Sequence, residues 1–115
     1  MLFNIQQDGD IHIIRLTGVT FSPSQISDIQ KQVSDMAGFG HVNFVADMGQ
    51  LKLLNSVVLS MLVVCLKKLR SKGGDLMLVN AGESIKRQLN VAQLASVFII
   101  AASVEEAKEK FTQKN

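Results

Sequence analysis

The sequence predicts an α/β fold: a mixed, mostly parallel sheet with an antiparallel edge at the N-terminus and about four helices. β-rich stretches alternate with longer segments whose apolar residues recur every three or four positions, and this alternation favours parallel strands with crossover helices. The first two β-rich stretches are instead joined by Asp8-Gly9-Asp10, a turn signal that predicts antiparallel pairing. A chain of 115 residues fits a single domain over 1–115.

A hairpin and a helix open the chain. Residues 2–7 and the β-branched stretch 11–16 predict the two strands of the hairpin. Ser22-Pro23-Ser24 is typical of a helix start, and Gly38 and Gly40 end that helix. Its apolar face is formed by Ile26, Ile29, Val33 and Met36.

The middle of the chain predicts a strand and the main buried helix. Residues 41–47 are a short apolar strand, and a polar break over 48–50 follows it. The next helix is expected from Asn55 or Ser56 to Arg70, because Asn and Ser are favoured N-caps and two glycines follow its end. Since its first turns are apolar nearly all round, we expect this helix to be buried.

The last third of the chain completes the alternation. Three elements are expected in this order: a strand over 75–79, a helix over 84–89 and a strand over 97–100. Residues 103–106 then match a capping box, with Ser at the cap and Glu three residues on, and predict a helix through Phe111. The tail 112–115 is expected to fray.

Composition limits the possible functions. The net charge is only +2 and the chain has no Tyr or Trp, so nucleic-acid binding is not expected. The basic residues Lys67, Lys68, Arg70 and Lys72 fit the solvated end of a helix. The N-terminus does not match a secretory signal, and the apolar run 53–66 is too short for a membrane span, which predicts a cytoplasmic protein without membrane insertion. No feature of the sequence sets the oligomeric state.

Catalytic and metal-binding patterns are not found in the sequence. His12 and His41 lack metal-ligand spacing and are expected at a sheet surface or strand end, and Cys65 has the apolar setting of a structural thiol. The glycine pair 73–74 precedes a strand, so it ends a helix and does not form a phosphate loop. We therefore expect no enzyme activity, no metal and no cofactor.

The order of elements and several local strings resemble the STAS domain, the family of anti-sigma factor antagonists and of the cytoplasmic domains of sulfate transporters. In that family a strand reaches Asp, a short connection leads to Asp-Ser-Ser-Gly at the start of an apolar helix, and Gly-Gly, a strand and a short helix follow. Here the resemblance runs from Ile11 to Lys110 and is carried by RLTG at 15–18, HVNFVADMGQL at 41–51, LLNSVVLSML at 53–62, KKLRSKGGDLMLVNAGESIKRQL at 67–89 and FIIAASVEEA at 98–107.

The resemblance implies a bacterial partner-switching protein that regulates transcription. In anti-sigma factor antagonists the first Ser of the motif is phosphorylated by a serine kinase that is also the bound anti-sigma factor, and a phosphatase reverses the reaction. On this sequence that serine is Ser56. A phosphate there would meet the positive end of a helix dipole, and its added charge would repel the partner. The implied partner-binding residues are Asn55, Ser56, Val57, Leu59 and Ser60.

Departures from the family pattern leave two alternatives open. Asn55 replaces the family's Asp, Val57 and Val58 replace Ser and Gly, and 19–21 lack the acidic residue that many members carry. In one alternative Asn55 and Ser56 only cap a buried helix, which is worth about 0.5 to 2 kcal/mol. In the other the chain is a STAS subunit or scaffold that binds a transporter ATPase without being phosphorylated.

Overall fold

The computed structural model describes residues 2–18 and 22–113. Within them the chain forms four helices and a five-stranded sheet in the order β1-β2-β3-β4-β5. The elements are β1 (Leu2–Asp8), β2 (Ile11–Gly18), α1 (Pro23–Gly38), β3 (Asn43–Leu51), α2 (Ser56–Ser71), β4 (Asp75–Val79), α3 (Glu83–Val91), β5 (Ile99–Ala101) and α4 (Val104–Gln113). β1 pairs antiparallel with β2, and the other strand pairs are parallel, which confirms the predicted fold class.

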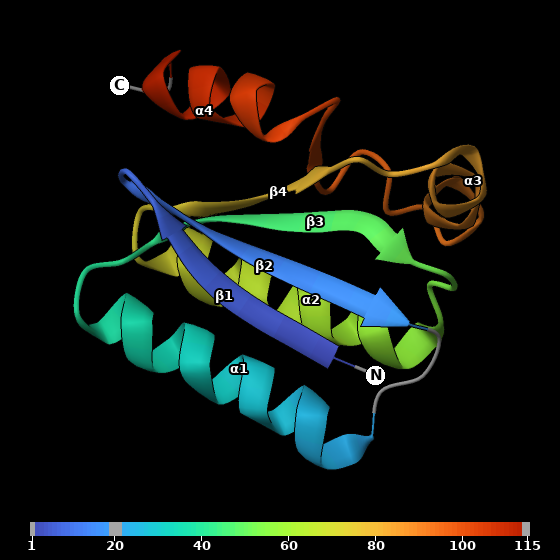
Figure 1. Ribbon diagram of the computed structural model, residues 1–115, viewed down its shortest axis with the longest axis horizontal. Helices are drawn as coiled ribbons and strands as arrows, with labels where there is room; N and C mark the ends of the chain where they lie inside the picture. Colours follow the sequence, from blue (N-terminus) through green and yellow to red (C-terminus); the bar gives the residue numbers. More distant parts are fainter. Residues whose placement is uncertain (1, 19–21, 114–115) are drawn as a thin grey trace.

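Helices cover both faces of the sheet (Figure 1). α1 and α2 lie side by side on one face, α4 lies on the other, and α3 lies near the end of the sheet where β3 terminates. The larger core joins the first face to α1, α2 and α3, and the smaller core joins the second face to α4. Because both faces are covered, every residue of β4 is buried, as expected of an inner parallel strand.

β3 is longer than the sequence predicts, and the polar break expected over 48–50 is wrong. The strand continues to Leu51 because it keeps a partner: after an irregularity between Arg15 and Thr17, Gly18 pairs with Leu51. Met48 lies within this extension and is buried, so apolar burial also supports it. The extension carries β3 to the end of the sheet where α2 begins.

α2 begins and ends close to the predicted limits but is buried on one face only. Its inward side chains are Val58, Met61, Leu62, Cys65, Leu66 and Leu69. Val57 and Val64 are 52% and 51% exposed, so the expectation of a helix buried all round its first turns is wrong on the outer face. α2 thus presents apolar side chains to solvent from its first turn onward.

The basic cluster at the end of α2 contains one structural residue. Lys67, Lys68 and Lys72 are exposed, as predicted for a solvated helix end. Arg70 instead donates from Nε to Oδ1 of the buried Asp75 at 3.1 Å, and from Nη2 to the carbonyl oxygen of Val97 at 2.9 Å. It therefore ties the end of α2 to the start of β4 and to the segment before β5.

The C-terminal elements differ slightly from the predicted limits. β5 begins at Ile99, two residues later than expected, and α4 continues to Gln113 rather than fraying from Thr112. The Ser103 cap is confirmed by a 3.2 Å bond from the Glu106 N–H to Oγ, although the Glu106 carboxylate accepts from the Ala102 N–H rather than from the cap. Residues 114 and 115 of the predicted tail lie outside the described residues.

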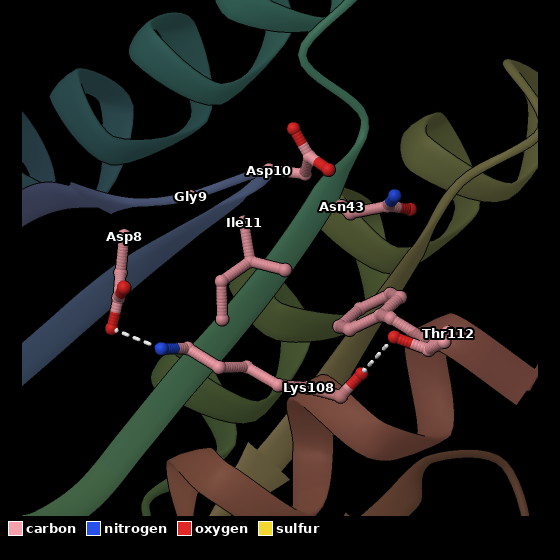
Figure 2. Close-up of a pocket in the computed structure, with 8 residues that line it drawn as sticks. Asp8, Gly9, Asp10, Ile11, Asn43, Lys108 and Thr112 are labelled. Atoms are coloured by element: carbon pink, nitrogen blue, oxygen red, sulfur yellow. Dashed lines mark hydrogen bonds and ion pairs between the residues drawn. The ribbon is translucent and has the colours of Figure 1, made fainter.

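α4 is also fastened to the hairpin turn. Figure 2 shows Lys108 reaching from α4 to Asp8, with Nζ 2.8 Å from Oδ2. The Thr112 hydroxyl donates to the carbonyl oxygen of Lys108 at 3.1 Å. A hollow of about 260 Å³ lies here, lined by Asp8, Gly9, Asp10, Ile11, Asn43, Lys108, Phe111 and Thr112. Lys108, the cation in this lining, is already paired with Asp8, so the contact holds α4 against the β1–β2 turn.

Candidate functional site

A four-residue connection carries the chain from β3 to Ser56. Leu54 is 5% exposed and anchors the connection in the core, while Leu53 is 43% exposed. The Lys52 N–H donates to the carbonyl oxygen of Gly18 at 2.9 Å. The Leu54 N–H donates to the side-chain oxygen of Gln88 on α3 at 3.2 Å. The start of α2 is therefore held by contacts with the sheet and with α3.

The cap of α2 is Asn55 and not Ser56. Asn55 has the extended φ of −94° and ψ of 173° of an N-cap, and its Oδ1 accepts from the Val58 N–H at 2.9 Å. Ser56 is the first helical residue and is exposed. Among the described residues its hydroxyl has no hydrogen-bond partner, so the Ser56 side chain is not required to cap α2.

The five residues expected to bind a partner lie on the first turns of α2. Ser56, Val57 and Ser60 are exposed, whereas Asn55 and Leu59 are half-buried. Ser56, Leu59 and Ser60 also line a shallow hollow of about 310 Å³, together with Val63, Val64 and Leu94. The structure thus places Ser56, Leu59 and Ser60 at one accessible hollow, while Val57 is exposed on the same turn without lining it.

A second groove extends this surface onto α3 and contains residues that the sequence analysis did not single out. The groove is about 350 Å³ in volume and is lined by Leu54, Asn55, Ser56, Leu59, Arg87, Gln88, Val91 and Ala92. Val91 is 80% exposed at its edge. The periodicity of Ile85 and Leu89 indicates which face of α3 is buried, but it does not show that the opposite face meets the start of α2.

Asp47, at the end of the predicted strand 41–47, holds neighbouring strands together. Its Oδ1 accepts from the Gly49 N–H at 3.0 Å and from Nδ2 of Asn80 at 3.1 Å. Its Oδ2 lies 3.6 Å from Nε of Arg15. The carboxylate thereby links the ends of β2 and β3 to Asn80, which follows β4. Residues 19–21, where the acidic family residue is replaced, lie outside the described residues.

The Cys65 thiol and the potential metal ligands of the described residues bear on catalysis and metal binding. Burial raises the pKa of the Cys65 thiol to about 11, so little of the reactive thiolate forms at neutral pH. In the part of the chain that the structure describes, no group of three or more His, Cys, Asp or Glu could hold a metal ion. Across the same residues, none of the helices combines the length and apolarity needed to span a bilayer.

The two histidines meet edge to face, with ring centroids 4.8 Å apart. His12 is 5% exposed and lies 5.3 Å from the Phe44 ring, and its Nδ1 has no hydrogen-bond partner among the described residues. The prediction that both histidines lie at a strand or its end holds for His12, on β2. His41 lies just before β3, which begins at Asn43 rather than at the predicted residue 41.

The burial of His12 predicts a pH-dependent stability. Burial, and secondarily the charge of His41, lowers the pKa of His12 from its ordinary value of 6.5. The unfolded chain therefore binds the proton more readily, and we expect the free energy of unfolding to fall as pH drops from 6.5 toward the lowered pKa. Urea unfolding at a series of pH values measures this slope.

Two variants separate the causes of this slope. His12→Phe should remove the contribution, because Phe does not titrate. His41→Gln should keep most of it, because burial is the larger cause. The same pH dependence in wild type and His12→Phe would show that His12 is not responsible.

Comparison with known proteins points to one family. The family model described as "STAS domain" matches residues 3–107. No curated protein sequence matches the chain. Forty-four chains of solved structures match it.

Three solved structures illustrate the likeness. Protein TM1081 of Thermotoga maritima is 23% identical, with a TM-score of 0.81 over 94% of this chain and 92% of that one. The anti-sigma factor antagonist SpoIIAA of Bacillus, unphosphorylated, is 17% identical, with a TM-score of 0.81 over 97% of each chain. A Ser-to-Glu variant of RsbS from Moorella thermoacetica is 14% identical, with a TM-score of 0.83 over 97% and 96%. At these identities the likeness concerns the fold.

Proposed function

Because the chain belongs to the STAS domain family, we propose that it is a non-enzymatic partner-switching regulator controlled by phosphorylation of Ser56. In this proposal a cytoplasmic serine kinase of the anti-sigma type binds the surface at the start of α2. The kinase then phosphorylates Ser56 and is released, and a phosphatase restores the binding form.

The division of roles between Asn55 and Ser56 carries the proposal. Asn55 caps α2, so the Ser56 hydroxyl is exposed and has no structural bond to lose among the described residues. The side chains around it suit a protein partner, because Leu53, Val57 and Val91 are large, apolar and exposed. Exposed apolar side chains that gather on one surface are typical of an interaction site.

The Val residues that replace the family's Ser and Gly leave Ser56 open. Val58 is fully buried and points away from the serine into the core. Val57 is half exposed beside Ser56 and adds apolar area to the docking surface rather than covering the hydroxyl. The substitutions are therefore compatible with a kinase reaching this side chain.

Phosphorylation would change the surface more than the fold. A phosphate adds about 1.5 to 2 negative charges, which offsets most or all of the net charge of +2 of this chain. At the first residue of α2 the group is accommodated by free backbone N–H groups and by the helix dipole. SpoIIAA, which shares the fold, has been solved in both its unphosphorylated and phosphorylated forms. We therefore expect loss of partner affinity without unfolding.

The proposal is tested by incubating the chain with ATP and each anti-sigma-type serine kinase encoded in the same genome, and measuring the intact mass. We expect wild type to gain one phosphate, Ser56→Ala to gain none, and Ser60→Ala, one turn away on the same surface, to behave as wild type. Equal phosphorylation of Ser56→Ala would overturn the site assignment. If wild type gained no phosphate, the proposed regulation by phosphorylation would be overturned.

One observation favours a second function, a constitutive subunit that binds a transporter ATPase. The apolar side chains beside Ser56 are strongly exposed, at 52% for Val57 and 80% for Val91, and such a surface suits permanent association. A permease and an ATPase gene beside this one, together with binding that does not respond to charge at Ser56, would support the second function.

A further inference from the structure

We propose that Arg87 of α3 receives the phosphate on Ser56, so that the modified side chain lies across the groove against α3 instead of projecting into solvent. The inference rests on the proposed function, since it concerns the phosphorylated form. It adds a residue outside the predicted set and gives α3 a role in the switch.

The groove brings the two side chains together. Ser56, from α2, and Arg87, from α3, both line it. The groove holds about 350 Å³, which is ample for a phosphate group. A phosphate on Ser56 therefore enters a space that the Arg87 side chain already borders.

The contacts of α3 hold it beside the segment that leads into α2. Gln88, the next residue along, accepts the Leu54 N–H at 3.2 Å, two residues before Ser56. On the opposite face Ile85 and Leu89 are 4% and 0% exposed in the main core. Arg87 is thus carried on a helix fixed both to the core and to the segment that leads into α2.

The charge of Arg87 is available for a new partner. Among the described residues its guanidinium makes no ion pair or hydrogen bond, although Glu83 lies one turn earlier on the same helix. Of the residues that line the groove, Arg87 carries a charge, and the others are apolar or are uncharged polar residues. Guanidinium groups bind phosphate through two parallel hydrogen bonds, a geometry that Lys does not provide.

The pairing predicts a measurable shift of the phosphate. A nearby cation favours the dianion, so the second pKa of the phosphoserine falls below its ordinary value of about 6. For an exposed pair we expect a fall of about 0.3 to 0.7 of a pH unit, reduced at high salt. Phosphoserine can be placed at position 56 during translation by an expanded genetic code, without any kinase, and titrated by phosphorus NMR.

Neighbouring residues of α3 supply the matched comparison. Arg87→Gln should return the phosphate pKa to its ordinary value. Lys86→Gln should leave it lowered, because Lys86 borders a different hollow, with Ala81 and Glu106. With Arg87 present, the NMR signal of its Nε–H should also differ between the unmodified chain and the chain that carries phosphoserine at position 56. A purely structural arginine would not give this response.

The outcomes distinguish this inference from the proposed function. The same phosphate pKa in wild type and Arg87→Gln, or an unmoved Arg87 signal, would overturn the pairing whether or not a kinase acts on Ser56. A lowered pKa that depends on Arg87 but not on Lys86 would establish the pairing. Failure of the kinase assay on wild type would count against the proposed function alone.

Discussion

Ser56→Glu is expected to weaken binding of the kinase-type partner by about 100-fold, whereas Ser56→Ala should bind within about threefold of wild type. The loss corresponds to about 2.7 kcal/mol and follows from placing a carboxylate within a largely apolar docking surface, where binding of the kinase would remove its water. Isothermal titration calorimetry with the kinase and a non-hydrolysable ATP analogue measures the difference without turnover.

Folding should not account for this loss. A carboxylate at the first residue of a helix interacts favourably with the dipole by about 0.3 to 1 kcal/mol, so Ser56→Glu should unfold no more easily than wild type. Urea unfolding of the same samples checks this. An affinity loss accompanied by destabilisation would point to a structural role for Ser56 instead.

Charge variants along α2 locate the sensitive surface. Ser60→Glu, one turn further on the same surface, should weaken binding by less than Ser56→Glu. Ser71→Glu adds the same charge at the far end of the helix, about 22 Å away at 1.5 Å per residue, and should leave affinity unchanged. Equal affinities of Ser56→Glu and Ser56→Ala would remove the charge switch and favour the constitutive subunit.

The sequence predicts best those elements whose limits depend on local chemistry. α2 begins at a capping Asn and ends at two glycines, and β4 is an apolar run between those glycines and the turn at Asn80, so both lie close to their predicted limits. The end of β3 depends instead on a distant partner. Gly18 pairs with Leu51 only after the irregularity in β2, and the 48–50 stretch itself contains a glycine and a glutamine that favour a break.

In the candidate site, too, the features set by local sequence are predictable and those set by distant contacts are not. Ser56 is identified by its place in a motif. Asn and Ser are both favoured N-cap residues, so the sequence does not show which of the two caps the helix. The assignment needs the extended backbone of Asn55 and its bond to Val58. Arg87 is more than thirty residues away along the chain, and only the packing of α3 against the connection before α2 brings it to the groove.

Gly74→Ala is expected to destabilise the fold by about 3 to 5 kcal/mol, the range of severe packing defects. Gly73, with a φ of 87°, and Gly74 close α2 through two bonds: the Gly73 N–H donates to the Arg70 carbonyl oxygen and the Gly74 N–H to that of Leu69. A Cβ on Gly74 would overlap the backbone carbonyl of Val42.

The overlap cannot be relieved by rotating a side chain, because the obstacle is backbone. The same Val42 carbonyl oxygen accepts the Asp75 N–H at 3.1 Å, next to the pairing of Asn43 with Asp75 that begins the β3–β4 ladder. Moving it would disturb the register of two buried strands at their first residues. The clash is therefore expected to cost far more than the conformational preference of one residue.

Gly38→Ala is the matched control. Gly38 is the last residue of α1, and a Cβ there would meet no atom within 4 Å. Ala is the better helix former, so this variant should be neutral or more stable by up to about 1 kcal/mol. Urea unfolding with an unchanged slope would show the difference as a shift in midpoint. A Gly74→Ala stability within about 1 kcal/mol of Gly38→Ala would mean that the Val42 carbonyl yields, and that the β3–β4 ladder tolerates movement where it begins.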